Sequence, residues 1–261
     1  MQRAASESTE TILNIESILK HWTSGIVQTP GAATLIAREF RAAYSDDSGF
    51  IDLDLCCADL GVELCDAALG LDGGEALLVP LADRLRVVVN KDFLATSTSA
   101  ASRRHRRRFR IAHELGHALF YGASPAGLPA VPAGLDEESF CDDFARSLLV
   151  SPMMRSPSAE SIATHSVTCD VSLEVAARAC AAEFPATRVG LWRWEAAPAG
   201  SPQPVVTQWA SDSKLGSELG IRSHRTDARA HTAVSARRQR LGHTSFAFLP
   251  RRRQLLAVAW R

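Results

Sequence analysis

Two histidines four residues apart form the most informative pattern in the chain. His113 and His117 begin and end the string His-Glu-Leu-Gly-His. Because an α-helix turns by about 100° per residue, their side chains project from one face, only about 40° apart. Two imidazoles in this arrangement bind one divalent ion, and the glutamate between them can act as a base without ligating it. The spacing predicts a metal site with Glu114 as the general base.

A second helical pattern, residues 136–150, is the expected source of a third ligand. Hydrolytic zinc sites use three protein ligands and keep a fourth position open. Glu138 borders the apolar stripe of this segment, and we predict that it is the third ligand, with the adjacent Glu137 as the alternative. Asp142, one turn later, is expected to hold the free N–H of a ligating histidine. Acidic residues near a helix start also favour the helix dipole, which would explain either glutamate alone.

The segment around the histidines has the composition of a helix. No proline occurs between Ala101 and Gly122, and apolar helix formers surround the histidine string. Tyr121 follows His117 by four residues and would share its face. We consider Tyr121 a possible oxyanion stabiliser, because hydrolysis develops negative charge on the carbonyl oxygen. Core packing would explain this tyrosine equally well.

Both segments resemble the signature of the ImmA/IrrE metallopeptidases. Residues 107–119 read Arg-Arg-Phe-Arg-Ile-Ala-His-Glu-Leu-Gly-His-Ala-Leu, and residues 138–145 read Glu-Ser-Phe-Cys-Asp-Asp-Phe-Ala. The second segment departs from the family pattern, since Asp142 replaces the usual Asn and Ser151 precedes Pro152. The aspartate is similar to the Glu-x-x-x-Asp arrangement of thermolysin-like zinc proteases and is compatible with activity.

The resemblance covers residues 30–185 and implies a bacterial or phage cytoplasmic protease. Such proteases cut a helix-turn-helix repressor, often of the XRE type, to release a stress or mobile-element programme. We therefore expect a protein substrate. Two histidines and a carboxylate favour zinc, and Mn²⁺ or Fe²⁺ are alternatives.

Two other functions remain open from the sequence. One is a non-catalytic regulator that binds DNA or protein and whose metal ion only stabilises the fold. The other is a hydrolase with a different substrate. Glu114 argues against the first, because a purely structural site has no use for a base.

Composition favours a cytoplasmic protein without a membrane partner. The chain has 261 residues, with 29 basic and 29 acidic side chains, so no global field attracts nucleic acid or membrane. No apolar stretch is long enough to cross a bilayer, and the polar start differs from a secretory leader. The 6 cysteines form no Cys-x-x-Cys pair and are expected to be reduced. We do not expect direct nucleic-acid binding.

The basic run over residues 103–110 works against the helix dipole, because it lies at a helix start. We expect part of it to pair with acids elsewhere in the fold and part to face the substrate. His105 lies more than two turns, about 12 Å, from His113 and is not expected to be a ligand.

The pattern of the whole chain predicts an α+β protein, with a zinc-protease-like helical core and a short mixed sheet. We expect an N-terminal extension (1–30, with a short helix at 11–22), a metallopeptidase core (31–156), a helix-turn-helix-like subdomain (157–188) and a small β-containing C-terminal module (189–261). Within the core, the predicted helices are 32–44 and 53–60, and the predicted strands are 62–65, 76–80 and 85–90.

Overall fold

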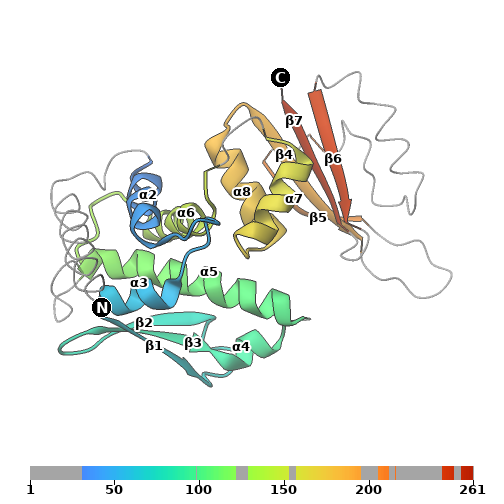
Figure 1. Cartoon of the computed structure of the whole chain (residues 1–261). Coiled ribbons are helices and arrows are strands. Elements are labelled where there is room, and N and C mark those ends of the chain that lie inside the picture. Colours follow the sequence, from blue (N-terminus) through green and yellow to red (C-terminus); the bar gives the residue numbers. More distant parts are fainter. Residues whose placement is uncertain are drawn as a thin grey trace, which may run out of the picture. The chain divides into compact units, whose positions relative to one another are not determined.

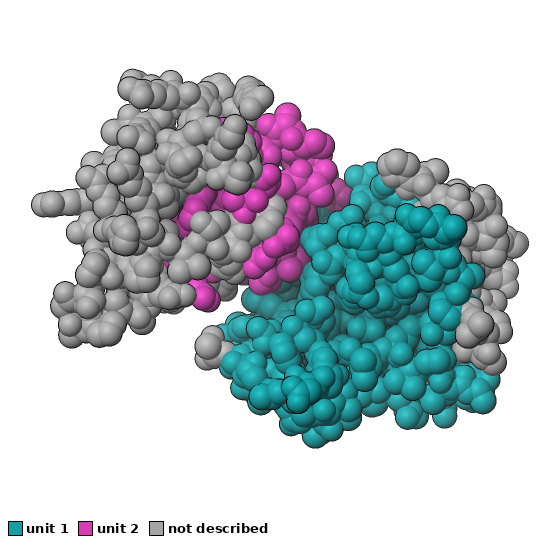
Figure 2. Space-filling model, turned by 180° about the vertical axis from the view of Figure 1, so that it is seen from behind, with its two compact units in different colours: residues 1–151, 168–171 teal, residues 152–167, 172–261 magenta. Residues whose placement is uncertain are grey.

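The computed structural model describes residues 31–97, 99–121, 129–152, 157–194, 205–211, 215, 243–249 and 254–260. The predicted extension, residues 1–30, lies outside this part of the chain. Two compact units are present, residues 1–151 with 168–171 and residues 152–167 with 172–261 (Figure 2). Helices and two small sheets together confirm the α+β class.

A three-stranded sheet forms the base of the first unit. Its strands are β1 (Val62–Ala67), β2 (Ala76–Pro80) and β3 (Leu85–Asn90), in the order β1-β3-β2. The central strand β3 is parallel to β1 and antiparallel to β2. Val87 and Val89 of β3 are fully buried, as its β-branched sequence predicts.

Helix α5 (Ala100–Ala118) contacts this sheet and carries the histidine string (Figure 1). It packs on β2 and β3, and on α6 (Glu137–Leu149), which in turn packs on α2 (Ala32–Tyr44). The C-terminal half of α5 supplies the buried face, through Ile111, Ala112 and Leu115. The apolar periodicity of α5 therefore fixes which way its histidines point.

Aspartate side chains cap the N-termini of two helices in this unit. Asp52 caps α3 (Leu53–Asp59), and Asp136 caps α6 by accepting a hydrogen bond from the Ser139 amide. The structure also contains α4 (Lys91–Ala95), which the sequence pattern did not indicate, and a 3₁₀ turn, η2 (Leu119–Tyr121). Five residues are too few to show a helical period.

The basic run of α5 is largely paired within the first unit. Arg104 binds Asp170, Arg107 binds Asp66, and Arg110 binds Glu75. Arg108 is buried, donates to the Ile51 carbonyl and lies over the Phe50 ring, while Arg106 lies over the Phe93 ring. His105 also contacts Asp170. These contacts confirm that part of the run pairs inside the fold.

The second unit combines two helices with a four-stranded antiparallel sheet. Its helices are α7 (Ala159–Thr168) and α8 (Leu173–Glu183), and α8 packs on β4. The strands are β4 (Thr187–Trp194), β5 (Val205–Ala210), β6 (His243–Leu249) and β7 (Gln254–Trp260), in the order β5-β4-β7-β6. Strand β6 pairs antiparallel with β7, so the described residues of the expected C-terminal module contain β structure.

All 6 cysteines are free thiols, as expected, and 5 of them are buried. Among the described residues, no helix combines the length and apolarity needed to cross a membrane.

Candidate metal centre

Three side chains converge between α5 and α6. His113 Nε2 and His117 Nε2 are 3.2 Å apart. Glu138 Oε2 lies 3.3 Å from His113 Nε2, and Glu138 Oε1 lies 3.5 Å from His117 Nε2. The predicted group thus comes together, with one donor atom from each residue, all within 4.8 Å of one another. His113 is buried, His117 is half-buried and Glu138 is open to solvent.

The separation of the two imidazole nitrogens fits a tetrahedral ion. With metal–ligand distances of about 2.0–2.1 Å, the edge of a coordination tetrahedron measures about 3.3 Å. The separation of the two histidine nitrogens, 3.2 Å, matches this edge, and Glu138 approaches each nitrogen through a different carboxylate oxygen. This group could hold a metal ion, and its ligand types do not by themselves select the element.

The second nitrogen of each imidazole is held by a carboxylate from α6. His113 Nδ1 lies 3.0 Å from Asp142 Oδ1, the contact that the sequence predicts. His117 Nδ1 lies 2.6 Å from Glu137 Oε1. The hydrogen bond from His113, together with the nearby Arg146, lowers the pKa of the Asp142 carboxyl. Glu137, the alternative third ligand, is therefore placed on the opposite side of His117 from the converging donors.

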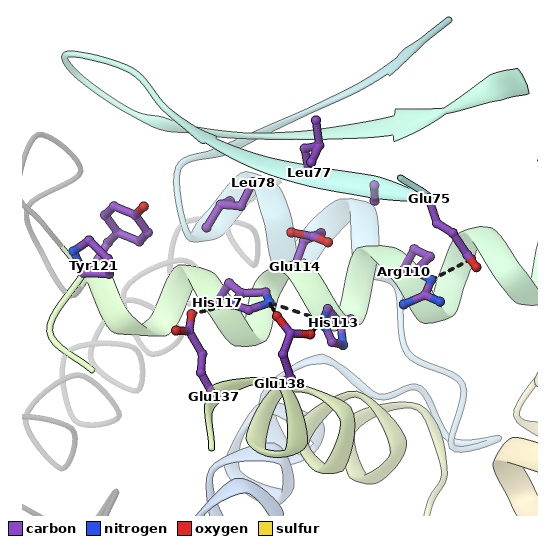
Figure 3. Close-up of a pocket in the computed structure, with 12 residues that line it drawn as sticks. Glu75, Leu77, Leu78, Arg110, His113, Glu114, His117, Tyr121, Glu137 and Glu138 are labelled. Atoms are coloured by element: carbon purple, nitrogen blue, oxygen red, sulfur yellow. Dashed lines mark hydrogen bonds and ion pairs between the residues drawn. The ribbon is translucent and has the colours of Figure 1, made fainter. Parts of the chain in front are cut away.

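Glu114 lies beside this group without joining it. Its carboxylate points from α5 toward β2, whereas the histidines point toward Glu138 on α6 (Figure 3). Only 7% of the residue is exposed, and burial raises its pKa, against the opposing charges of His117 and His113. A raised pKa is the direction of shift that brings a carboxylate closer to the range in which general bases work near neutral pH.

A pocket of about 390 Å³ joins these groups. Leu77 and Leu78 of β2 line one side of it, and α5 lines another. Tyr121 lies at one end and the Arg110–Glu75 pair at the other (Figure 3). Tyr121 thus shares the pocket with the histidines, and its role as an oxyanion stabiliser stays a prediction.

A glycine allows α6 to approach α5 closely enough to deliver Glu138. A Cβ atom at Gly116 would lie 3.0 Å from Cys141 Cα and 3.1 Å from both Cys141 Cβ and Sγ. Such contacts are tighter than most packed carbon pairs, so a larger residue would require Cys141 to shift by a few tenths of an ångström.

Sequence reasoning missed two features of this site. It did not place Arg110 and Glu75 in the pocket, because their pairing joins segments 35 residues apart. For Glu137 it offered a ligand role or a favourable place at the helix start, and neither role implies the contact with His117. Glu137 directly precedes Glu138 and therefore lies about 100° from it around the helix. This offset was the one available signal that the two glutamates contact different atoms.

No known family model matches the chain, and no curated protein matches it.

Proposed function

We propose that this chain is a zinc-dependent endopeptidase of the ImmA/IrrE type, which hydrolyses a peptide bond in a protein substrate. The observation that carries the proposal is the relationship of Glu114 to the three converging donors. A purely structural metal site closes its coordination sphere and needs no general base. Here the carboxylate of Glu114 lies buried in the same pocket and stays outside the donor group.

His113, His117 and Glu138 would hold the ion, and Asp142 would orient His113. The ion supplies Lewis acidity, which polarises a carbonyl and lowers the pKa of water. Glu114 then accepts the proton from the attacking water on a carboxylate oxygen. It delivers that proton to the leaving amine nitrogen as the carbon–nitrogen bond breaks. General acid–base transfer of this kind contributes typically about 10²–10⁴-fold in rate.

The substrate we propose is a helix-turn-helix repressor of the XRE type, whose cleavage releases a stress or mobile-element response in the cytoplasm. This part of the proposal is supported by the resemblance of the two motif segments. The pocket is within the size range of ligand-binding cavities, so it offers room for side chains of a bound peptide.

The alternative, a DNA-binding regulator stapled by metal, has less support. DNA binding requires basic side chains that are available to contact phosphates. Arg104, Arg107 and Arg110 are instead paired with carboxylates of the protein. Helix α8 is rich in alanine, and its Arg178 is engaged by Glu174 in the same helix.

The decisive experiment is Glu114→Gln. We expect zinc content to stay at the wild-type level, while cleavage of a proteome-derived peptide library, or of a repressor encoded next to the gene, disappears. Glu63→Gln is a matched control, because Glu63 pairs with Arg86 on the sheet and does not line the pocket. Cleavage that survives in Glu114→Gln would remove Glu114 from the mechanism. A zinc-loaded wild type that cleaves nothing, while binding duplex DNA tightly at physiological salt, would favour the regulator.

A further inference from the structure

Glu137 occupies a position that the proposed reaction does not yet explain. It is the first residue of α6, next to the ligand Glu138, and it lines the same pocket. Its Oε1 atom lies 2.6 Å from His117 Nδ1, the nitrogen that faces away from the converging donors. This is the shortest contact that either histidine makes with a carboxylate of α6.

The chemistry of this contact fixes the state of the ring. A carboxylate only accepts hydrogen bonds, so His117 Nδ1 must carry the hydrogen and donate a hydrogen bond to Glu137. In a neutral imidazole the lone pair then lies on Nε2, the atom that faces His113 Nε2 and Glu138 Oε1. Glu137 therefore selects both the tautomer and the ring orientation that a metal ligand needs.

The two carboxylates that hold the histidines differ in their other partners. Asp142 also accepts from Arg146, whose guanidinium lies 3.2 Å from Asp142 Oδ2. In the part of the chain that the structure describes, the ion pairs of Glu137 involve His117 alone. The negative charge on Asp142 is thus shared between two cations or donors, whereas that on Glu137 acts on a single imidazole.

We propose that Glu137 is the positioning residue for His117, and that it contributes more to metal retention than Asp142 does. This inference rests on the proposed metal site and adds a residue to it. Outer partners of metal-ligating histidines typically contribute about 10–100-fold in affinity. Glu137 belongs at the upper end of that range, because its contact with the imidazole is shorter than that of Asp142 and its described ion pairs involve His117 alone.

The test compares zinc affinity in the full-length chain for Glu137→Gln, Glu137→Ala, Asp142→Asn and Glu138→Ala. We expect Glu137→Ala to weaken zinc binding by about 10–100-fold. Glu137→Gln should recover part of the loss, because the amide oxygen still accepts from Nδ1, and it should remain weaker than Asp142→Asn. Glu138→Ala should lose more than any of them, since it removes a ligand.

Cobalt substitution gives a second measurement that general destabilisation would not move. The visible absorption of Co²⁺ reports the geometry of its ligands, and we expect it to shift in Glu137→Ala while the unfolding midpoint of the metal-free chain stays the same. Unchanged zinc affinity and an unchanged cobalt spectrum in Glu137→Ala would overturn the inference and leave the metal site intact. If Glu138→Ala kept its zinc affinity and Glu137→Ala lost it completely, Glu137 would be the third ligand in place of Glu138. A wild-type chain that binds neither ion would refute the metal site itself.

Discussion

Gly116 of α5 lies directly against Cys141 of α6, close to the place where the metal-binding side chains of the two helices converge. The contact is specific to glycine, because an added Cβ would approach the backbone of Cys141 as well as its sulfur. Backbone cannot rotate away, so relief would require movement of α6. The absence of a side chain at residue 116 thus permits the close approach of the two helices that carry the histidines and Glu138.

The first prediction concerns Gly116→Ala. Overpacking costs about 1–3 kcal/mol, and the higher helix propensity of alanine returns about 1 kcal/mol, so we expect a net loss of stability of about 1 kcal/mol. Zinc affinity should fall by about tenfold, because the donors are held out of position. Isothermal titration and urea unfolding measure the two effects. Adding Cys141→Ala removes the sulfur contact and should restore part of both.

The second prediction concerns stabilisation by zinc. An ion that binds only the folded chain, present at a hundred times its dissociation constant, raises the free energy of unfolding by about 2.7 kcal/mol. We expect this gain in the wild type, its reversal by a chelator, and a much smaller gain in Glu138→Ala at the same zinc concentration. Asp143→Ala changes an exposed acid of the same helix and should keep the full gain. Equal gains in all three proteins would show that zinc stabilises the chain elsewhere.

The third prediction concerns acid stability. Arg104 donates two hydrogen bonds to Asp170, and these lower the pKa of the Asp170 carboxyl. A carboxyl with a lowered folded-state pKa stabilises the fold fully above its ordinary value, about 3.9, and loses that contribution as pH falls through the lower folded value.

Asp170→Asn should therefore be less stable than the wild type at neutral pH, and the difference should shrink toward zero in strong acid. Asparagine suits the positive φ of 49° at this position, so the substitution tests charge rather than backbone strain. Urea unfolding over a pH series provides the measurement, with the exposed Asp72→Asn as control. A pH-independent difference would assign the effect to packing.

The fourth prediction concerns Gly190 in β4. A Cβ there would lie 2.2 Å from the Cη2 atom of Trp192, whose ring is buried and folds back over the glycine. Gly190→Ala should destabilise the chain by about 1–3 kcal/mol, because the ring must leave its place. Tryptophan fluorescence during unfolding measures the loss. In a Trp192→Ala background the penalty should vanish, and a penalty that persists would mean that another neighbour opposes the methyl group.

Periodic and capped segments were the predictable part of this fold. Residues 32–44, 76–80 and 85–90 form the predicted elements at the predicted ends, because their apolar spacing and turn residues agree with the tertiary structure. The prediction of β1 ended at Cys65, two residues early, since Asp66 breaks the apolar pattern while its backbone still pairs with Val89.

The donor group was also predictable, because helical spacing sets the direction of each side chain relative to its neighbours. Two imidazoles one turn apart, and one carboxylate on the next apolar helix, converge as the spacing indicates. Contacts between distant segments were not predictable in the same way. The Glu137–His117 hydrogen bond depends on the packing of α6 against α5, and spacing within one helix carries no information about it.

Both imidazoles come from one helix, and Glu137, Glu138 and Asp142 all come from the other. A newly made or partly unfolded chain therefore possesses only an isolated histidine pair, which is a poor ligand set. Under the proposed function, hydrolytic capacity arises together with tertiary structure, and a chain still emerging from the ribosome is harmless to its neighbours until these two helices have met.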